Sequence, residues 1–572
     1  MSDQTKDSEK PQSKDTSSGM ATGAANNETN ENERLTDNTK GEQELQAEHE
    51  HDKTMASEAA KPEDGKMTMW LVLAVMATVL GSPTQFGYNM GVINAPEATI
   101  RDFYKSVYMQ GKGEKLTEAD MNFIWSCTVS VYAVGGMIGS ASAGFFANLL
   151  GRKRTLLCNN FIGALGGTIM FFARYAGQDS YPALVSSMII GRIVVGINAG
   201  VNTIVAPMYV SEIAPVNLRG SLGVLFQFGV VLALFFAQIL GLPQLLGNEE
   251  YWNYLLGLTV VPATFQIIVL SVCPESPRYE LVNKGNRESA MSGLRKLRAK
   301  EDVSKDIKFL EDEHKLESAE KKLGRMELLT DFTLREPLVI ALTLQVAQQL
   351  SGINAVNFYS TTIFRQAELS EQSSRIATVG TGASQLLMIM PTIFLMDRVG
   401  RRTLMLFGTG GMCVCSGLVV LFTLLSKTGN SIFMWSNLAA VFGIMGSFSV
   451  APGPVPWLIT AELFTTGPRA AAMSLAGATN WIMTFLVGLA FESVLHVLGD
   501  YTFLVFMGLD YIFWLFIFMK VPETKGRTVQ DIVQKFREKA FKANPRKAAQ
   551  YEQDKQARAV TVGDQAIKST DA

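Results

Sequence analysis

The stretch Gln348-Gln349-Leu350-Ser351-Gly352-Ile353-Asn354 places three carboxamide side chains inside a mostly apolar run that extends from residue 337 to residue 364. A run of this length is enough to cross a bilayer as a helix. Polar groups at membrane depth are costly, so they usually face a partner helix or a water-filled cavity. Each carboxamide offers donors and an acceptor on one fork, which suits the vicinal hydroxyls of a sugar. Hydrogen bonding between helices is the alternative, and the clustering of three carboxamides beside Gly352 favours a polar ligand.

Polar tails dilute the hydropathy of an otherwise apolar chain. Of its 572 residues, 47% are hydrophobic, and the mean hydropathy is +0.15. Residues 1–66 contain no Val, Ile, Phe, Tyr, Trp or Cys and carry 16 acidic against 8 basic residues. Such a segment buries too little apolar surface to offset its chain entropy, so we predict a disordered tail. No basic cluster carries the interleaved aromatic residues that would suggest a nucleic-acid partner.

Length and apolarity predict twelve membrane-spanning helices and therefore an all-α membrane protein. A long charged gap separates the first six spans from the last six. Because twelve is even, both termini are expected on the same side of the bilayer. The predicted spans are residues 67–93, 122–147, 154–175, 182–208, 219–242, 252–272, 337–364, 373–396, 403–426, 432–459, 470–493 and 502–519.

The distribution of Lys and Arg predicts which side holds the termini, because short loops rich in these residues stay in the cytoplasm. The gap 273–336 and the turns at 152–154 and 401–402 are basic, whereas the turns 243–251 and 494–501 contain no Lys or Arg. The loop 95–121 carries Arg101 and three lysines, which weakens the contrast without reversing it. Both tails and the central gap are therefore predicted to be cytoplasmic.

Five parts are expected along the chain. They are a disordered tail (1–66), an N-terminal six-helix bundle (67–272), a cytoplasmic helical linker (273–336), a C-terminal six-helix bundle (337–521) and a tail that begins as a helix (522–572). In the linker, Leu294 and Leu297 recur on one helical face, and 302–323 is a charged helical pattern. The second tail begins with an amphipathic pattern that predicts docking on the bundle or on the lipid surface: Val529, Ile532, Val533, Phe536 and Ala540.

Three features of the first half recur in the second half at nearly one offset. The turn Gly151-Arg152-Lys153 matches Gly400-Arg401-Arg402, 249 residues later. Glu212 with Arg219 matches Glu462 with Arg469, 250 residues later, and Pro274-Glu275-Ser276 matches Pro522-Glu523-Thr524, 248 residues later. These matches predict a duplication of six spans. Two like halves around a central site are typical of transporters whose opening alternates between sides.

The repeated charges all map to the predicted cytoplasmic ends of spans. Arginines there are expected to pair with the spaced glutamates and with Asp397. Each surface pair is weak, but a set shared between two halves can bias a two-state equilibrium. Cytoplasmic anchoring alone would explain the arginines but not the glutamates. We therefore expect a cytoplasmic gate formed by Arg152, Glu212, Arg219, Glu275, Arg278, Asp397, Arg401, Arg402, Glu462 and Arg469.

Nothing in the sequence indicates an enzyme. There is no nucleotide-binding loop, no metal-ligand spacing and no nucleophile with an adjacent base, so neither a cofactor nor a metal is expected. The cysteines fall in apolar runs or at their edges and are expected to be free thiols: Cys127, Cys158, Cys273, Cys413 and Cys415.

Several motifs together resemble the sugar porter family of the major facilitator superfamily. They are Gly191-Arg192, Pro207-Met208-Tyr209-Val210-Ser211-Glu212, Pro274-Glu275-Ser276-Pro277-Arg278, the 348–354 stretch and Pro522-Glu523-Thr524-Lys525-Gly526-Arg527. The resemblance covers about residues 67–540. Within the family, the segments 86–96 and 452–457 make the chain most similar to the animal facilitative glucose transporters. The resemblance implies the major facilitator fold, a sugar ligand that we expect to be D-glucose, and a plasma-membrane location.

The resemblance also implies a sugar held mainly by the C-terminal half. Amides pair with hydroxyls, and an indole offers an apolar face plus one N–H donor. Proline and glycine residues before Trp457 are expected to break the tenth span and give a flexible gate. Gln385 stands where the family usually has Asn and is included as a contact. The implied contacts are Gln227, Gln348, Gln349, Asn354, Gln385, Trp457 and Asn480.

A facilitative glucose uniporter that works by alternating access is the function that the resemblance implies. Family members that use protons carry Asp where this chain has Asn89, and an amide does not titrate near neutral pH. A proton–sugar symporter and a sugar sensor that signals through its tails are the alternatives. Asp510 lies near the middle of the twelfth span, where a carboxylate is costly, and is expected to be a neutral structural residue.

Overall fold

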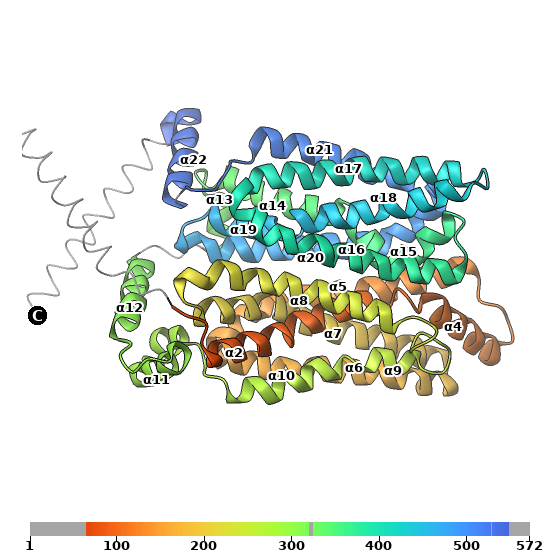
Figure 1. The fold of residues 1–572 in the computed structure, drawn as a ribbon, viewed down its shortest axis with the longest axis horizontal. Coiled ribbons are helices and arrows are strands. Elements are labelled where there is room, and N and C mark those ends of the chain that lie inside the picture. The colour runs from red at the N-terminus through yellow and green to blue at the C-terminus, as the bar shows by residue number, and fades with distance from the viewer. Residues whose placement is uncertain (1–64, 320–323, 528, 548, 550–572) are drawn as a thin grey trace, which may run out of the picture. The chain divides into compact units, whose positions relative to one another are not determined.

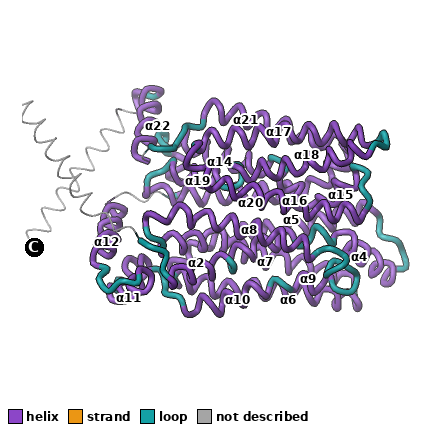
Figure 2. The backbone as a smooth tube through the Cα atoms, viewed as in Figure 1, coloured by secondary structure: helices purple, strands orange, loops and turns teal. Residues whose placement is uncertain are grey.

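The structure is a computed structural model of the chain, and it describes residues 65–319, 324–527, 529–547 and 549. The predicted disordered tail therefore lies outside the described residues, apart from Gly65 and Lys66, as does the end of the C-terminal tail. The described residues form helices joined by turns and loops (Figure 2), in agreement with the predicted all-α class. All five cysteines are free thiols, as expected.

The N-terminal half consists of six spans and an additional helix, α4, between the first and second spans. The first span is divided into α2 and α3, and the sixth into α9 and α10. The elements are α2 (Met69–Val79), α3 (Ser82–Gly91), α4 (Glu97–Lys112), α5 (Glu118–Leu150), α6 (Arg152–Asp179), α7 (Tyr181–Ile213), the 3-10 turn η1 (Val216–Leu218), α8 (Arg219–Leu240), α9 (Trp252–Gly257) and α10 (Val260–Val272).

The C-terminal half repeats this plan with its first and fourth spans divided. These are the seventh span, α14 and α15, and the tenth span, α18 and α19. The elements are α14 (Arg335–Leu350), α15 (Ile353–Gln366), α16 (Glu371–Val399), α17 (Arg401–Ser426), α18 (Ser431–Val450), α19 (Val455–Glu462), α20 (Thr466–Leu498), the 3-10 turn η3 (Gly499–Tyr501) and α21 (Thr502–Lys520).

The helix lengths agree with twelve membrane crossings. Ten helical stretches of the described chain are long and apolar enough to cross a membrane, and the last of them, Gly467–Lys520, contains both α20 and α21. Counting these two separately and adding the 29-residue α16 gives twelve. The predicted number of spans is therefore confirmed.

Close helix contacts in the N-terminal half depend on glycine. A Cβ added at Gly139 of α5 would lie 2.1 Å from the carbonyl oxygen of Ile197, and one added at Gly200 of α7 would lie 2.2 Å from the carbonyl oxygen of Gly136. Small residues let two helix backbones approach where lipid provides no hydrophobic drive between helices. The backbones of α5 and α7 therefore pack directly on one another.

The linker and the second tail both pack against one end of the bundle, on the left in Figure 1. The linker forms a short π-helical turn, η2 (Tyr279–Asn283), and the helices α11 (Arg287–Arg298), α12 (Ser304–Ala319) and α13 (Arg325–Thr330). Leu294 and Leu297 are buried on α11, as their spacing predicted. The predicted tail helix is α22 (Val529–Ala543), and it docks on the bundle through buried Ile532 and Val533. We call this end the linker end, and the opposite end, which carries α4, the α4 end.

The two halves touch through several helix pairs. α5 packs on α20, α8 packs on α16, and α3 meets α15. Trp481 of α20 lies between Phe86 of α3 and Tyr132 of α5, with ring centroids 5.9 Å and 6.0 Å apart. These contacts cross the boundary at which an alternating-access cycle would separate the halves.

Candidate functional site

The seventh span is interrupted next to the carboxamide stretch. α14 ends at Leu350 and α15 begins at Ile353, and Gly352 between them has a φ of +85°. This left-handed backbone favours glycine, and a Cβ there would approach the Phe506 ring at 3.1 Å. The sequence predicted one continuous run, whereas the structure has a discontinuous helix of the kind that builds transporter sites.

Four of the predicted contacts form one hydrogen-bonded group, which we call the carboxamide network: Gln348, Gln349, Asn354 and Asn480. Gln349 Nε2 donates to Gln348 Oε1 at 3.1 Å and to Asn480 Oδ1 at 2.9 Å. Asn354 Nδ2 donates to Gln349 Oε1, and Asn480 Nδ2 donates to Gln348 Oε1 at 2.5 Å. All four side chains belong to buried residues. The network joins α14, α15 and α20 through donors and acceptors that a hydroxylated ligand could replace.

Gln348 also ties this network to the break in the tenth span. Its Nε2 donates to the carbonyl oxygens of Pro452 at 2.8 Å and of Gly453 at 2.6 Å. α18 ends at Val450 and α19 begins at Val455, so both carbonyls belong to the interrupted segment. The break that proline and glycine predicted is therefore present, and it lies directly on the carboxamide network.

Trp457 borders the network by packing. It lies half-buried on α19, and a Cβ at Gly477 of α20 would lie 3.8 Å from its ring. Gly477 precedes Asn480 by three residues, which is about one helical turn. The indole therefore covers α20 next to the network, where it can offer an apolar face to the C–H groups of a ligand.

Two further carboxamides belong to this region and were missed by the sequence analysis. Gln345 is fully buried; its Oε1 accepts a hydrogen bond from Asn480 Nδ2 at 2.8 Å, and its Nε2 has no hydrogen-bond partner among the described residues. Asn357 Oδ1 accepts a hydrogen bond from Gln385 Nε2 at 3.3 Å, so Gln385 contacts α15 and not the network itself. Gln345 precedes Gln349 by four residues and Asn357 follows Asn354 by three, so helical spacing was the signal for both.

Gln227 is the predicted contact from the N-terminal half. It lies half-buried on α8, which packs on α16, the helix that carries Gln385. In the part of the chain that the structure describes, no hydrogen bond joins Gln227 to the carboxamide network. The structure therefore places Gln227 on a helix at the boundary between the halves and does not bring it into the network.

Asn94 joins the two halves at the α4 end. It lies between α3 and α4, and its Nδ2 donates to the carbonyl oxygen of Asn357 at 2.8 Å and to Ser360 Oγ at 2.7 Å. Its Oδ1 accepts a hydrogen bond from Thr361 Oγ1 at 3.3 Å. Asn94 is fully buried. These bonds hold α15 to the N-terminal half. They therefore keep the two halves together at the α4 end of the molecule.

At the linker end, the internal repeat builds the same helix start twice. Gly151 precedes α6 with a φ of +99°, and Gly400 precedes α17 with a φ of +102°. The Glu275 carboxylate accepts hydrogen bonds from two N–H groups in the first turn of α6, at 2.8 Å and 3.4 Å. The Glu523 carboxylate does the same for α17, at 2.9 Å and 3.2 Å. A carboxylate here satisfies free donors and is stabilised by the helix dipole.

Among the described residues, an arginine–glutamate pair from the predicted gate lies in each half. Arg152 pairs with Glu212 at 2.8 Å with side chains 8% and 9% exposed, and Arg401 pairs with Glu462 at 3.5 Å with side chains 16% and 23% exposed. The first pair joins α6 to α7, and the second joins α17 to α19. The sequence predicts a set shared between the halves, whereas these two pairs brace each half internally. The side chain of Asp397 lies outside the described residues.

The remaining gate candidates lie at the same end. Arg219 and Arg278 approach Glu313 of the linker helix α12 at 3.8 Å and 3.6 Å. Arg402 donates to a backbone carbonyl of α21 at 2.5 Å, and Arg469 donates to the loop before α20 at 3.1 Å. The linker is thus tied to the N-terminal half by charge.

Arg192 is a fully buried arginine on α7. Its Nη1 donates to the carbonyl oxygen of Asn89 at 2.7 Å, and its guanidinium carbon lies 4.6 Å from the centre of the Tyr132 ring. The Asn89 carboxamide itself accepts a hydrogen bond from Thr259 Oγ1 at 2.9 Å. Arg192 is thus held by a backbone carbonyl and an aromatic face.

Asp510 lies in the middle of α21, fully buried, and neither of its carboxyl oxygens has a hydrogen-bond partner among the described residues. An ionised carboxylate in this position would bear a large desolvation cost, so we expect it to be protonated and structural. Asp510→Asn should therefore leave the rate of sugar uptake within about twofold, because an amide can occupy the same volume without charge. Uptake at matched expression checks this, and a lost pH dependence in the variant would instead make Asp510 a proton carrier.

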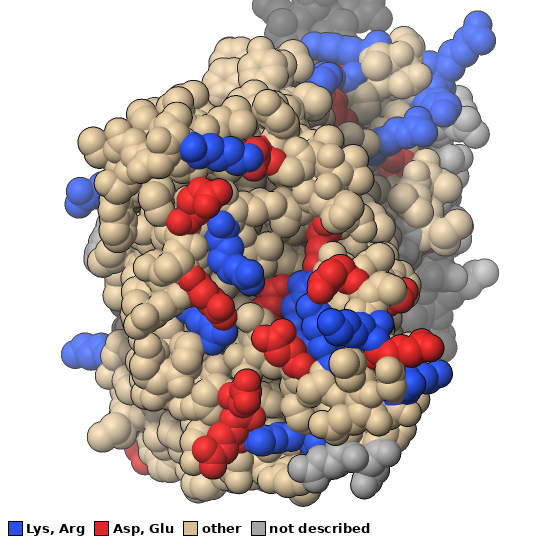
Figure 3. Space-filling model, turned by 90° about the vertical axis from the view of Figure 1, so that its right-hand side faces the viewer, with Lys and Arg blue, Asp and Glu red and all other residues tan. Residues whose placement is uncertain are grey.

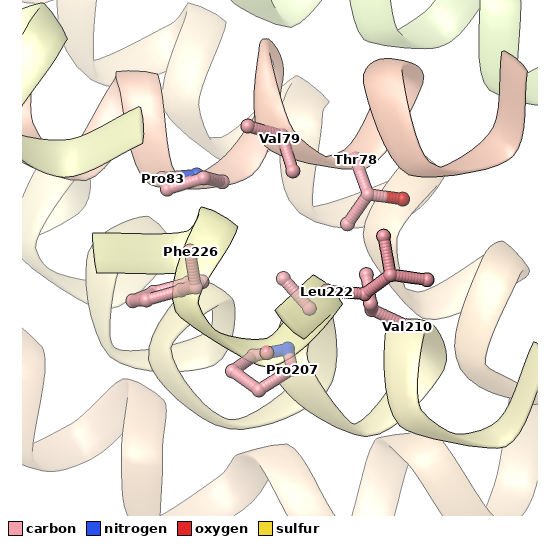
Figure 4. A pocket seen from close by; sticks show the side chains of 9 residues that line it. Thr78, Val79, Pro83, Pro207, Val210, Leu222 and Phe226 are labelled. Atoms are coloured by element: carbon pink, nitrogen blue, oxygen red, sulfur yellow. The ribbon is translucent and has the colours of Figure 1, made fainter. Parts of the chain in front are cut away.

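An apolar pocket with an empty volume of about 210 Å³ lies among α2, α3, α7 and α8. Pro83 of α3 and Pro207 inside α7 lie on opposite sides of it (Figure 4). Thr78 contributes a hydroxyl group to the lining, and this hydroxyl already donates to the carbonyl oxygen of Ala74 at 2.8 Å. The pocket therefore offers a sugar little hydrogen bonding, and the carboxamide network is the better candidate site.

Two bundles of six spans, with broken helices around a polar centre, define a membrane transporter of the major facilitator type. The xylose transporter XylE from E. coli, in a partially occluded inward-open conformation, has this fold with a TM-score of 0.67 and 23% identity, over 81% of this chain and 100% of that chain. XylE bound to 6-bromo-6-deoxy-D-glucose gives a TM-score of 0.66 and 23% identity, over 82% and 99%. The predicted fold is therefore confirmed.

Sequence relatives define the family. Residues 73–536 match the family described as "Sugar (and other) transporter". The chain is 42% identical to solute carrier family 2, facilitated glucose transporter member 3, of Canis lupus familiaris, over 84% of this chain and 95% of the relative. It is 41% identical to member 1 of Gallus gallus, over 83% and 94%. The chain belongs to this sugar transporter family; it is a multi-pass membrane transporter and not an enzyme.

Proposed function

We propose that the chain is a facilitative hexose carrier that moves D-glucose down its concentration gradient by alternating access. The observation that carries the proposal is the carboxamide network of Gln348, Gln349, Asn354 and Asn480, buried beside two helix breaks. Its amides now bond mainly to one another. Sugar hydroxyls can replace these bonds at little cost, since they are both donors and acceptors. The relatives named as glucose transporters support glucose as the first sugar to test.

The other predicted contacts extend the same site. In this proposal Gln345, Gln385 and Asn357 add polar groups along α14, α15 and α16. Trp457 covers the apolar face of the sugar, and Gln227 closes on it from the N-terminal half. The helix breaks at 351–352 and 451–454 supply the mobility that a site open alternately to two sides needs.

The charged residues at the linker end form the gate of this carrier. We place that end in the cytoplasm of a cell whose plasma membrane holds the protein, with both termini cytoplasmic and the α4 end outside. The Lys and Arg residues of the linker and of the turns at 152–154 and 401–402 support this orientation. In the closed form of the gate, the two braced halves approach one another at this end.

Transport should be uniport and not proton-coupled. Asn89, whose backbone carbonyl accepts a hydrogen bond from Arg192, carries an amide and not a carboxylate, and an amide cannot exchange a proton near neutral pH. We expect D-glucose to reach the same final level in sealed proteoliposomes with and without a pH gradient, because no proton moves with the sugar. Uptake should survive a protonophore and reverse with the sugar gradient.

The matched controls are protein-free vesicles and L-glucose, which tests the stereochemistry of the site. Accumulation of D-glucose above its external concentration, driven by inside-alkaline pH, would replace the uniporter with a symporter. Absence of any mediated flux, together with specific sugar binding, would favour the sensor.

A further inference from the structure

A cluster of charged groups bridges the two halves at the α4 end. Arg101 Nη1 of α4 lies 2.9 Å from Glu97 Oε1 on the same helix and 2.9 Å from Glu492 Oε1 on α20. Glu492 Oε2 accepts a hydrogen bond from Ser126 Oγ of α5 at 3.1 Å, and Glu97 Oε2 accepts one from Thr362 Oγ1 of α15 at 3.2 Å. We call these five residues the outer cluster. Two elements from each half are thereby held together.

The outer cluster contains two carboxylates and one guanidinium, and it is shielded from water. Glu97 is 4% exposed and Glu492 is 8% exposed. Both carboxylates bond to the same Nη1 of Arg101, so one negative charge is left in excess when both are ionised. Excess charge in a buried site is costly, and one shared proton removes it. Figure 3 faces this end and shows acidic and basic side chains side by side near its middle.

We propose that Glu97 and Glu492, bridged by Arg101, form a proton-binding site that holds the outer ends of the two halves together. The inference rests on the proposed alternating-access cycle and on the α4 end facing outward. When the halves part at this end, α4 and α5 move away from α15 and α20, and both carboxylates meet water. The site for the shared proton then disappears, so external protons are ligands of the outward-closed state.

The electrostatics of Glu97 agree with this site. Burial raises the pKa of the Glu97 carboxyl above its ordinary value; Arg101 opposes the rise, and the neighbouring Glu492 adds to it. Because the pKa is raised in the closed state, the proton stabilises closure fully at low pH, and this contribution is lost as the pH rises through the raised pKa. External acid should therefore hold the carrier closed toward the outside.

Other charged, titratable or polar groups around the outer cluster come from three elements. Lys105 of α4 pairs with Glu118 of α5 at 2.8 Å, in an exposed position. Tyr359 of α15 donates its hydroxyl to the carbonyl oxygen of Gly488 at 3.0 Å. Asn122 of α5 accepts a hydrogen bond from Arg101. Glu118 therefore already has its own cation, which makes it a suitable control for the carboxylates of the outer cluster.

The test measures D-glucose influx into proteoliposomes in which the protein is oriented, with internal pH fixed near neutrality. Lowering the external pH from about 7.5 to about 5 should slow influx about three- to tenfold, because a tenfold change corresponds to one pKa unit between the two states. Glu492→Gln should abolish this pH dependence, since Arg101 then neutralises Glu97 alone. Glu118→Gln, the matched control, should keep the wild-type profile.

A second readout does not depend on transport. Ser130 of α5 is buried against Gly488 of α20, where an added Cβ would lie 3.4 Å from the Ser130 side chain. Ser130→Cys in a Cys127→Ser background should react with an external, membrane-impermeant thiol reagent only when the halves part. Labelling, normalised to Ser106→Cys on the exposed face of α4, should fall with external acid and should lose that dependence after Glu492→Gln.

A flat pH profile of both influx and labelling in the wild type would overturn the proton site, as would an unchanged profile in Glu492→Gln. These results differ from failure of the proposed function. A chain without mediated flux fails as a carrier, and one that accumulates sugar against its gradient fails as a uniporter, whereas the proton site predicts a change of rate without accumulation.

Discussion

Gln349→Ala should raise the half-saturation concentration for D-glucose about 5- to 150-fold, which corresponds to about 1–3 kcal/mol for two or three lost hydrogen bonds. Gln349 is the centre of the carboxamide network: its Nε2 bonds to Gln348 and Asn480, and its Oε1 accepts from Asn354. Alanine removes both functions of the amide and takes one hydrogen bond from each of three buried neighbours. Gln348→Ala should have a similar effect and should also release the carbonyls of the 452–453 break.

The measurement is initial-rate uptake at matched surface expression, with equilibrium sugar binding as a second readout. Asn437→Ala is the matched control, because Asn437 is a buried carboxamide of the same half whose Nδ2 bonds to the carbonyl oxygen of Val419 at 3.0 Å and to Thr423 Oγ1 at 2.8 Å. If Asn437→Ala weakens sugar binding equally, the loss reflects general destabilisation. Unchanged kinetics in both Gln348→Ala and Gln349→Ala would remove these residues from the site.

Glu462→Ala should slow turnover about 5- to 30-fold, the equivalent of about 1–2 kcal/mol, while sugar affinity stays within a few-fold. Its partner Arg401 starts α17, and the pair ties α17 to the end of α19, the helix that carries Trp457. Without the pair, the start of α17 is no longer held to α19, so the gate residues at this end do not move together with the rest of the C-terminal half. Glu212→Ala should have a larger effect and should lower thermal stability as well. Its pair with Arg152 is shorter and more buried, so the variant leaves an uncompensated charge.

Asp500→Ala is the control for the gate variants, because Asp500 pairs at the opposite end of α17 with Lys427, whose side chain is 50% exposed. Removing that pair should change turnover by less than about twofold, in keeping with the weak energies of exposed ion pairs. Normal turnover in both Glu462→Ala and Glu212→Ala would show that the charges at the linker end serve only to orient the chain in the membrane.

Much of the fold was predictable because it depends on local composition. Twelve long apolar runs predicted the spans, and the offset of about 250 residues predicted two like halves. The breaks were predicted unevenly: proline and glycine before Trp457 indicated the break in the tenth span, whereas the single Gly352 did not stand out within an apolar run. Its role depends on a left-handed backbone beside Phe506, which is a tertiary contact.

The residues of the candidate site could be predicted where they belong to sequence motifs. Contacts between segments that lie far apart in the sequence could not. Gln348, Gln349, Asn354 and Asn480 lie together in the structure. Their contact with a sugar, which the resemblance implied, stays a prediction. The sequence, by contrast, showed Arg101 only as a positive charge in the loop 95–121, which is predicted to lie outside the cytoplasm. Its partner Glu492 lies 391 residues away, and no local pattern connects the two. The pairing of Arg152 with Glu212 and of Arg401 with Glu462, each within one half, likewise depends on helix packing.

The carboxamide network has an electrical consequence. A membrane potential acts on charge with about 2.3 kcal/mol per elementary charge per 100 mV. The amides of Gln348, Gln349, Asn354 and Asn480 are neutral, and a hexose is neutral as well. The membrane potential therefore does no work on a sugar whose hydroxyl groups bind to the amides of this site. The direction of flow is then left to the two sugar concentrations, and the same protein can fill a cell or empty it.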